Sequence, residues 1–184
     1  NRYTGPGDSH ATAVVVDGSG NVFVTGYSWT GRSYDYTTVA YSSAGVPLWT
    51  NRYNRLGDTD DQARAVAVDG SGNVIVTGYS YGSGGEYSDY ATIKYSGAGV
   101  PLWTNRYPAD SATDLALDGS GNVHVTGGSG SDYATIKYSG AGAPLWTNRY
   151  NGPGNNSDSA NAMAVDSSGN VFVTGYSWTG RSYD

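Results

Sequence analysis

The chain has no cysteine, one methionine and two phenylalanines among its 184 residues. Without thiols it can form neither a disulfide scaffold nor a cysteine-ligated metal site. Basic residues are also few, 10 against 16 acidic ones, and the net charge of −6 disfavours a nucleic-acid backbone as partner. The sequence contains no run of about 18 apolar residues, so we expect no membrane span.

Glycine, tyrosine and tryptophan are abundant instead, with 28, 17 and 5 residues. A coiled coil would be rich in Ala, Glu, Lys and Leu in heptads, so this composition excludes that class. A cysteine-free chain rich in Tyr and Gly suits an oxidising environment, where a free thiol is a liability. We therefore expect an extracellular or cell-surface location.

The sequence repeats itself about every 50 residues. The motif Asp-(Gly/Ser)-Ser-Gly-Asn-Val begins at Asp17, Asp69, Asp118 and Asp166. A second motif, Pro-Leu-Trp-Thr-Asn-Arg-Tyr, begins at Pro47, Pro101 and Pro144, and its last three residues also open the chain. Residues 1–184 therefore form a single repeat array, with units at approximately 1–53, 54–107, 108–150 and 151–184, the last one incomplete.

Each repeat contains four strand-like runs. In the second repeat they cover residues 63–69, 73–80, 90–95 and 101–107, which are rich in Val, Ile, Thr, Tyr and Trp and bounded by Gly, Ser, Asp and Pro. The short connections favour antiparallel pairing of neighbours. Four antiparallel strands repeated at this period are typical of a β-propeller blade. The sequence predicts an all-β propeller with about three and a half blades.

Residues 65–80, Ala-Val-Ala-Val-Asp-Gly-Ser-Gly-Asn-Val-Ile-Val-Thr-Gly-Tyr-Ser, resemble the bacterial SBBP β-propeller repeat, which is related to NHL-type propeller repeats. The following Asp-Tyr-Ala-Thr-Ile-Lys-Tyr and Trp-Thr-Asn-Arg-Tyr segments resemble the same arrays. The resemblance implies the propeller fold and a secreted or surface protein of bacteria. It implies no catalytic residues and no fixed ligand.

The ring is incomplete, because a propeller needs about 4 to 8 blades to close. Residues 19–35 and 168–184 are also identical, at an offset of three repeats. Three explanations fit: a longer tandem chain, a designed or reassembled fragment, or self-association in which copies complete a ring or build a filament. The expected partners are therefore copies of the same chain or further repeats of a longer one.

Loops that vary between repeats should meet at one rim, where strands two and three and successive repeats are joined. Variable loops on a rigid scaffold are where binding usually occurs, although they are also where length variation is tolerated. The candidate ligand-binding residues are the aromatic and charged ones on this rim: Trp29, Arg32, Tyr34, Tyr81, Glu86, Tyr87, Trp178 and Arg181.

The sequence suggests no catalytic residues, metal site or cofactor. His10 is expected in a variable loop, and His124 takes the strand position of Phe23, Ile75 and Phe172, so no Ser-His-Asp arrangement can be argued. The Asp-Gly-Ser-Gly-Asn loops could be read as calcium ligands, but an Asx-turn within a hairpin explains them better. The recurring Arg52 and Asp35 positions suggest a cross-strand ion pair in each blade.

Three hypotheses follow. The leading one is a non-catalytic extracellular propeller module with a structural or protein-interaction role, completed by self-association or as part of a longer tandem chain. The alternative is a lectin-like propeller that binds a glycan through the aromatic rim. The third is an enzyme whose active loops lie outside this chain.

Overall fold

The computed structural model describes residues 3–55, 57–82 and 88–178. These residues form 14 β-strands and no helix, which confirms the all-β prediction. The strands of blade 1 are β1 (Ser9–Val16), β2 (Val22–Trp29), β3 (Tyr34–Tyr41) and β4 (Pro47–Tyr53). Those of blade 2 are β5 (Asp61–Val68), β6 (Val74–Tyr81), β7 (Ser88–Tyr95) and β8 (Pro101–Pro108). Those of blade 3 are β9 (Ser111–Leu117), β10 (Val123–Ser129), β11 (Asp132–Tyr138) and β12 (Pro144–Tyr150), and a half blade follows with β13 (Asp158–Val165) and β14 (Val171–Ser177).

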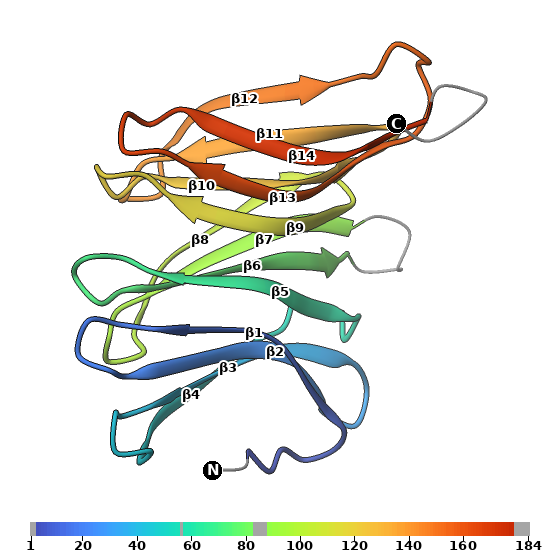
Figure 1. Cartoon of the computed structure of the whole chain (residues 1–184). Helices are drawn as coiled ribbons and strands as arrows, with labels where there is room; N and C mark the ends of the chain where they lie inside the picture. The colour runs from blue at the N-terminus through green and yellow to red at the C-terminus, as the bar shows by residue number, and fades with distance from the viewer. Residues whose placement is uncertain (1–2, 56, 83–87, 179–184) are drawn as a thin grey trace.

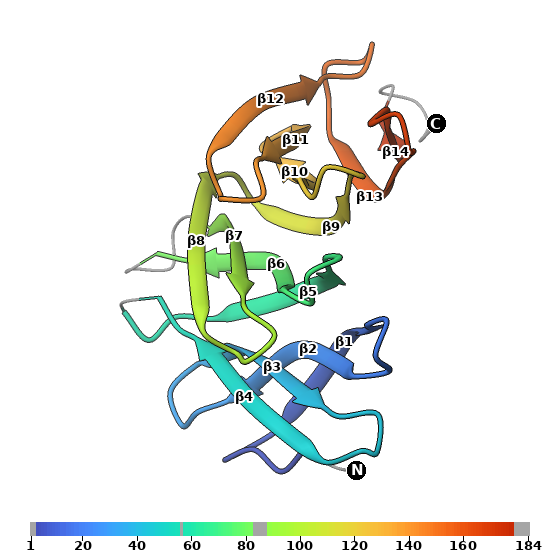
Figure 2. The same ribbon diagram turned by 90° about the vertical axis from the view of Figure 1, so that its left-hand side faces the viewer.

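Each blade is an antiparallel meander in chain order, with four strands in blades 1 to 3 and two in the half blade. The sheets stack face to face along the chain (Figure 1). The first strands of the blades gather on one side of the stack and the fourth strands on the other, so that the sheets follow an arc whose ends do not meet (Figure 2). The fold is thus an open β-propeller of about three and a half blades.

The hairpin between strands one and two is built by one aspartate. In blade 1, Asp17 Oδ1 accepts the backbone N–H groups of Ser19 and Asn21, each at 2.8 Å, and its Oδ2 accepts the Asn21 side-chain amide at 2.8 Å. Gly20 adopts a φ of 81°, a left-handed conformation that glycine reaches without strain. Asp69, Asp118 and Asp166 repeat these contacts, so the predicted Asx-turn is confirmed.

The first strand of each blade carries a β-bulge that the sequence analysis missed. In blade 2 the register with β6 shifts between Ala63 and Ala65, so Arg64 is an extra residue. Gly78 lies opposite, and a Cβ there would overlap the carbonyl oxygen of Gln62. Bulges add local twist to a sheet. Their repetition at one place in every blade therefore shapes each blade in the same way.

The core lies between blades, because blades 2 and 3 pack against a neighbouring sheet on both of their faces. Phe23, Tyr36 and Val76 are among the residues buried between blades 1 and 2, and Ile75, Val125 and Ile136 between blades 2 and 3. Tyr36 also donates its hydroxyl to the Ala91 carbonyl of the next blade at 3.1 Å. Sheets covered on both faces do not need alternating charged residues, which accounts for the small number of charges in the strands.

A second contact joins successive blades at their outer edge. Trp49 Nε1 of β4 donates to the Gly97 carbonyl of blade 2 at 2.8 Å, and Asn51 Nδ2 donates to the Gly99 carbonyl at 2.6 Å. Trp103 and Asn105 of β8 make the same bonds to blade 3, at 3.2 and 2.6 Å. We call this pair of bonds the outer joint.

Arginines extend the contact between blades. Arg106 donates to the Tyr53 hydroxyl of the preceding blade at 2.9 Å, and Arg52 donates to the Tyr3 hydroxyl at 2.5 Å. The expected cross-strand ion pair of Arg52 with Asp35 is therefore wrong: in the described part of the chain these arginines bind tyrosines across blades. Asp89 pairs instead with Arg55 at 2.8 Å.

Candidate functional site

The loops divide between the two ends of the strands as expected. The β1–β2 and β3–β4 loops and their counterparts lie at one end, while the β2–β3 loop and the described part of the β4–β5 loop lie at the other (Figure 1). This second end carries the predicted rim residues that the structure describes, which are Trp29, Arg32, Tyr34, Tyr81 and Trp178. The other three candidates, Glu86, Tyr87 and Arg181, lie outside the described residues.

Trp29 and Tyr34 belong to an aromatic cluster on blade 1 with Tyr27 and His10. The Trp29 and Tyr34 rings meet edge to face at 5.3 Å, as do those of Tyr27 and Tyr34. His10 stacks on Tyr27 at 4.9 Å between ring centroids. His10 lies in strand β1 and not in a variable loop, so that expectation is wrong. The sequence held a signal for Tyr27, because it shares a strand face with Trp29 two residues away.

Arg32 lies outside the aromatic cluster and contacts blade 2. Its guanidinium forms an ion pair with Asp58 at 2.8 Å, and its side chain is 80% exposed. The backbone N–H of Tyr34 donates to Asp60 Oδ1 at 3.0 Å. The β4–β5 loop therefore fixes the rim of blade 1 through carboxylates, and such an exposed ion pair contributes little to stability.

The remaining rim candidates lie on other blades and do not converge with Trp29. Tyr81 packs against Tyr79 at 5.4 Å, and the Arg64 guanidinium lies 5.4 Å from the Tyr79 ring centre. Trp178 follows β14 in the half blade. The corresponding positions in blade 3 are glycines, Gly128 and Gly130. The rim thus carries separate aromatic groups on blade 1, blade 2 and the half blade, and none at the equivalent positions of blade 3.

His124 is a core residue of blade 3. It is fully buried, its Nε2 lies 3.3 Å from Asp118 Oδ2, and its ring meets Trp146 edge to face at 5.7 Å. Burial lowers its pKa below the usual 6.5, so the ring is neutral at pH 7. Lys137 also contacts Asp118, at 2.9 Å. Among the residues described, no three His, Asp or Glu side chains are grouped so as to hold a metal ion.

Asp61 is the most perturbed carboxyl group at the variable rim. It is fully buried at the start of β5, and its Oδ2 accepts the Arg55 backbone N–H at 2.8 Å. Its Oδ1 has no hydrogen-bond partner in residues 3–55, 57–82 and 88–178. Burial raises the pKa of Asp61 from 3.8 to about 6. Ser9 takes this position in blade 1, whereas Asp110 takes it in blade 3 and Asp158 in the half blade. Asp158 is also buried, with an Oδ1 that has no hydrogen-bond partner among the described residues.

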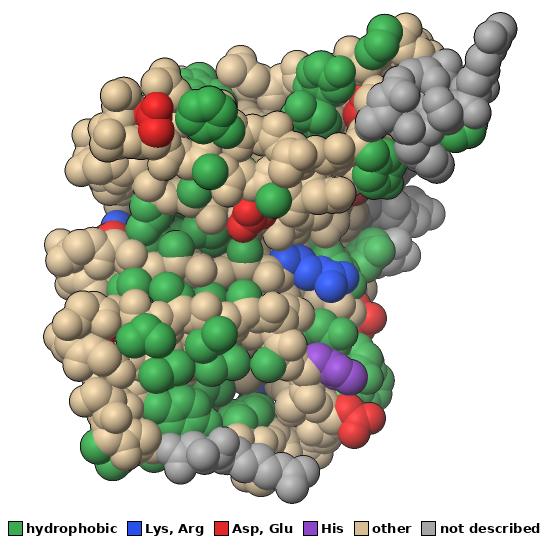
Figure 3. All heavy atoms as spheres, in the orientation of Figure 1, with side chains coloured by type: hydrophobic (Ala, Val, Ile, Leu, Met, Phe, Trp, Pro, Cys, Tyr) green, Lys and Arg blue, Asp and Glu red, His purple; other side chains and the backbone are tan. Residues whose placement is uncertain are grey.

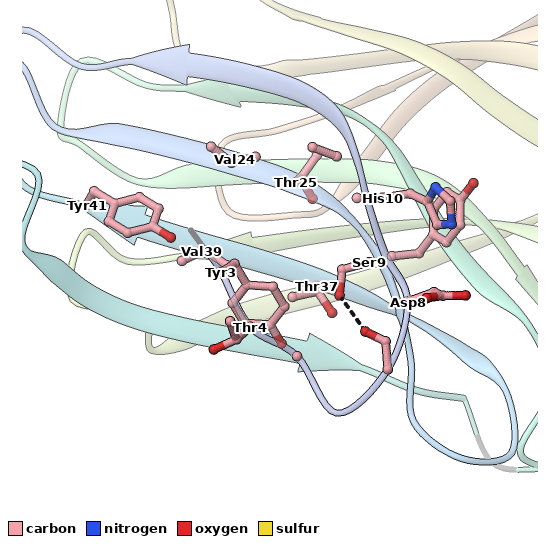
Figure 4. A pocket seen from close by; sticks show the side chains of 15 residues that line it. Tyr3, Thr4, Asp8, Ser9, His10, Val24, Thr25, Thr37, Val39 and Tyr41 are labelled. Atoms are coloured by element: carbon pink, nitrogen blue, oxygen red, sulfur yellow. Dashed lines mark hydrogen bonds between the residues drawn. The ribbon is translucent and has the colours of Figure 1, made fainter. Parts of the chain in front are cut away.

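Two hollows lie at the two open ends of the stack. A cavity of about 620 Å³ opens on the outer face of blade 1 and is lined by Tyr3, Val24, Val39 and Tyr41 among others (Figure 4). Hydrophobic side chains gather over β1 at the same end (Figure 3), where Val14 is 63% exposed. Blades 2 and 3 cover their equivalent faces with a neighbouring sheet, so this cavity marks a blade face without its neighbour.

The second hollow is a groove of about 280 Å³ between blade 3 and the half blade. Tyr133, Trp146 and Asn148 line one wall, and Val171 and Val173 of β14 line the other. In blade 2 the strands β7 and β8 occupy the corresponding space beside β6, and in blade 3 the strands β11 and β12 occupy it beside β10. The groove is therefore the place where two further strands would complete the fourth blade.

The comparisons with known proteins agree with this architecture. The SBBP β-propeller repeat model matches residues 146–180, which confirms the resemblance to that repeat family. A crystal structure of a protein of unknown function from Bacteroides caccae superposes with a TM-score of 0.58 at 13% identity, covering 90% of this chain and 53% of that one. The chain thus spans about half of that protein, and the likeness concerns the fold alone. A comparison with curated proteins finds no match.

Proposed function

We propose that this chain is a non-catalytic β-propeller repeat module of a secreted or surface protein, with a structural or protein-interaction role. Further repeats, from another copy or from a longer chain, cover its open ends. The absence of cysteine and the resemblance to SBBP repeats support the extracellular assignment. The engagement of Asp69 and Asp118 in turns and lysine pairs supports a non-catalytic role.

The observation that carries the proposal is that each end of the stack presents one half of the outer joint. At the C-terminal end, Trp146 and Asn148 of β12 correspond to Trp103 and Asn105, but the described residues offer them no carbonyl acceptor. At the N-terminal end, the Ser43 and Gly45 carbonyls correspond to those of Gly97 and Gly99, and none of the placed residues donates to them. The two ends are therefore complementary.

The solution mass tests this proposal. Light scattering on a sizing column, at two protein concentrations, should give either a discrete small oligomer or larger species that grow with concentration. The first result indicates a closed ring and the second a filament, which electron microscopy would distinguish from amorphous aggregate. A monomer of 19.2 kDa at both concentrations would contradict self-association.

A second candidate function is glycan binding by the aromatic cluster of blade 1. Trp29 is 37% exposed beside Tyr34, and flat aromatic faces stack on sugar rings. A glycan array is the direct test, with Trp29→Ala as the variant and Trp49→Ala, in the outer joint, as a control away from the rim. Binding that Trp29→Ala removes and the control keeps would support this function; no signal above background would exclude it.

A further inference from the structure

The unpaired edge of β14 has the same sequence as the edge of β2 that pairs with β3. Within the described part of the chain β14 pairs with β13 alone, whereas β2 pairs with both β1 and β3. Residues 168–184 are identical to residues 19–35, so every β14 side chain has its copy in β2. A strand that fits β2 in register therefore also fits β14, and the strand that fits β2 is β3 (Tyr34–Tyr41).

The hairpin before this edge is also equivalent to its N-terminal counterpart. β13 pairs with β14 from Asp158↔Ser177 to Val165↔Val171, and β1 pairs with β2 from Ser9↔Ser28 to Val16↔Val22. Both hairpins place a bulge at the same point. They are preceded by similar segments, Asn-Arg-Tyr-Thr-Gly-Pro-Gly from residue 1 and Asn-Arg-Tyr-Asn-Gly-Pro-Gly from residue 148. The two hairpins therefore share their strand register, their bulge and the sequence of their second strand.

We propose that two copies of this chain associate by exchanging this hairpin: β13–β14 of one copy takes the place of β1–β2 in a second copy and pairs with its β3. This inference rests on the self-association proposed above and specifies its geometry. The exchange preserves the strand pairing of blade 1, because the incoming and the displaced second strands have the same sequence. The occupant of the groove beside β14 is thus the β3–β4 hairpin of the second copy.

The exchange completes the contacts that are open in one copy alone. Trp146 and Asn148 gain the Ser43 and Gly45 carbonyls of the second copy as acceptors. Those carbonyls lie in a loop with the same hydrogen bonds as its counterparts, Gly45 N–H to the Ser42 carbonyl at 2.8 Å and Gly99 N–H to the Ser96 carbonyl at 2.8 Å. A hybrid blade therefore forms the same outer joint as blades 2 and 3.

The exchange also gives Tyr150 the arginine contact that the equivalent tyrosines have in one copy. Tyr53 and Tyr107 are half-buried and each receives an arginine from the next blade. Tyr150 is 43% exposed, and in the hybrid arrangement Arg52 of the second copy approaches it as it approaches Tyr3 in one copy. If the exchange is reciprocal, two copies form six blades, namely blades 2 and 3 of each copy and two hybrid blades, which lies within the usual range. The β1–β2 hairpin of each copy is then displaced from the ring.

Engineered disulfides distinguish exchange from simple stacking. Thr25 and Thr38 are cross-strand partners whose Oγ1 atoms lie 2.9 Å apart, and Thr174 is the β14 copy of Thr25. The wild-type chain has no cysteine, so any disulfide is the engineered one. The variant Thr38→Cys/Thr174→Cys should form a disulfide between chains, and the matched variant Thr25→Cys/Thr38→Cys should form one within a chain. Both substitutions are nearly isosteric, and circular dichroism checks that each variant folds.

The expected result has two parts. Oxidised Thr38→Cys/Thr174→Cys runs as a covalent dimer on a denaturing gel, with Thr174→Cys alone as the control. Oxidised Thr25→Cys/Thr38→Cys, with β2 locked to β3, is monomeric by light scattering and associates again when reduced.

The opposite results separate the two proposals. Association of the wild type without the cross-chain disulfide, or association of the locked variant, overturns the exchange and leaves self-association by stacking. A wild-type chain that stays monomeric overturns both.

Discussion

Replacing Asp61 by asparagine should stabilise the chain at neutral pH. The Asp61 carboxyl group is fully buried, and within the described structure one of its two oxygens lacks a partner. Burial raises its pKa from 3.8 to about 6. Each pKa unit corresponds to about 1.4 kcal/mol, so ionising this group costs about 3 kcal/mol more in the folded chain than in the unfolded one.

The pH dependence of this effect has a definite sign. Below pH 3.8 the carboxyl group is protonated in both states and contributes no penalty. Between pH 3.8 and about 6 the folded state binds more protons than the unfolded state, so the stability contributed by Asp61 falls as the pH rises. Above pH 6 the group is ionised in both states and the full penalty applies. Asparagine removes this term and still accepts the Arg55 N–H through its side-chain oxygen.

Urea unfolding at pH 4, 5, 6 and 7.5 measures the effect. We expect Asp61→Asn to have nearly the wild-type free energy of unfolding at pH 4 and to exceed it by about 1–3 kcal/mol at pH 7.5. Asp61→Ser, which places the residue of blade 1 there, should show the same trend with a smaller gain because the Arg55 N–H loses its acceptor. A difference that does not change between pH 4 and 7.5 would refute the reasoning.

Three further predictions concern the blade core and the outer joint. His124→Phe should raise the free energy of unfolding at pH 7 by about 1 kcal/mol, because the buried Nδ1 has no partner in the structure as described. Folding lowers the pKa of His124, so the wild type should lose stability as the pH falls below 6.5. The variant should lose less, and urea titrations at pH 5 and 7 would show the difference. Gly78→Ala should destabilise by at least about 2 kcal/mol, because its Cβ would overlap the Gln62 carbonyl, whereas Gly70→Ala, whose Cβ meets open space, should leave the melting temperature nearly unchanged. Asn51→Ala should lower the free energy of unfolding by about 1 kcal/mol, because it removes the hydrogen bond to the Gly99 carbonyl. Asn148→Ala should leave the free energy of unfolding unchanged at low protein concentration. It should raise the dissociation constant for self-association about fivefold, measured by sedimentation.

The sequence predicted the strands well because each one is bounded by turn chemistry. In the second repeat the predicted runs 63–69, 73–80, 90–95 and 101–107 correspond to β5 to β8 within two residues at each end. The Asx-turn at Asp69 was equally predictable, since its side-chain acceptors act within five residues of chain. Local interactions of this kind can be predicted from short sequence motifs.

Contacts between blades were harder to predict, because they depend on how sheets stack. The recurrence of arginine beside tyrosine was visible, but its partner was misassigned to Asp35 on the adjacent strand when the structure places it on the preceding blade. The bulge at Arg64 likewise has no signature in a strand pattern with a period of two. The aromatic cluster was half predicted. Trp29 and Tyr34, which end β2 and begin β3, were chosen because they flank a variable loop, whereas Tyr27 lies further inside β2 and His10, expected in a loop, lies in β1.

The repetition of the joint has a consequence for assembly. In a repeat protein each unit contacts only its neighbours, so the surface that one blade offers backward matches the surface that it offers forward. Trp49 and Trp103 donate hydrogen bonds to the following blade, and the Gly97 and Gly140 carbonyls accept them from the preceding blade. An open stack of such blades therefore always ends in two complementary surfaces, whatever its number of blades. If the ends associate as proposed above, the arc of the stack decides between a ring and a filament, since the contacts are the same in both.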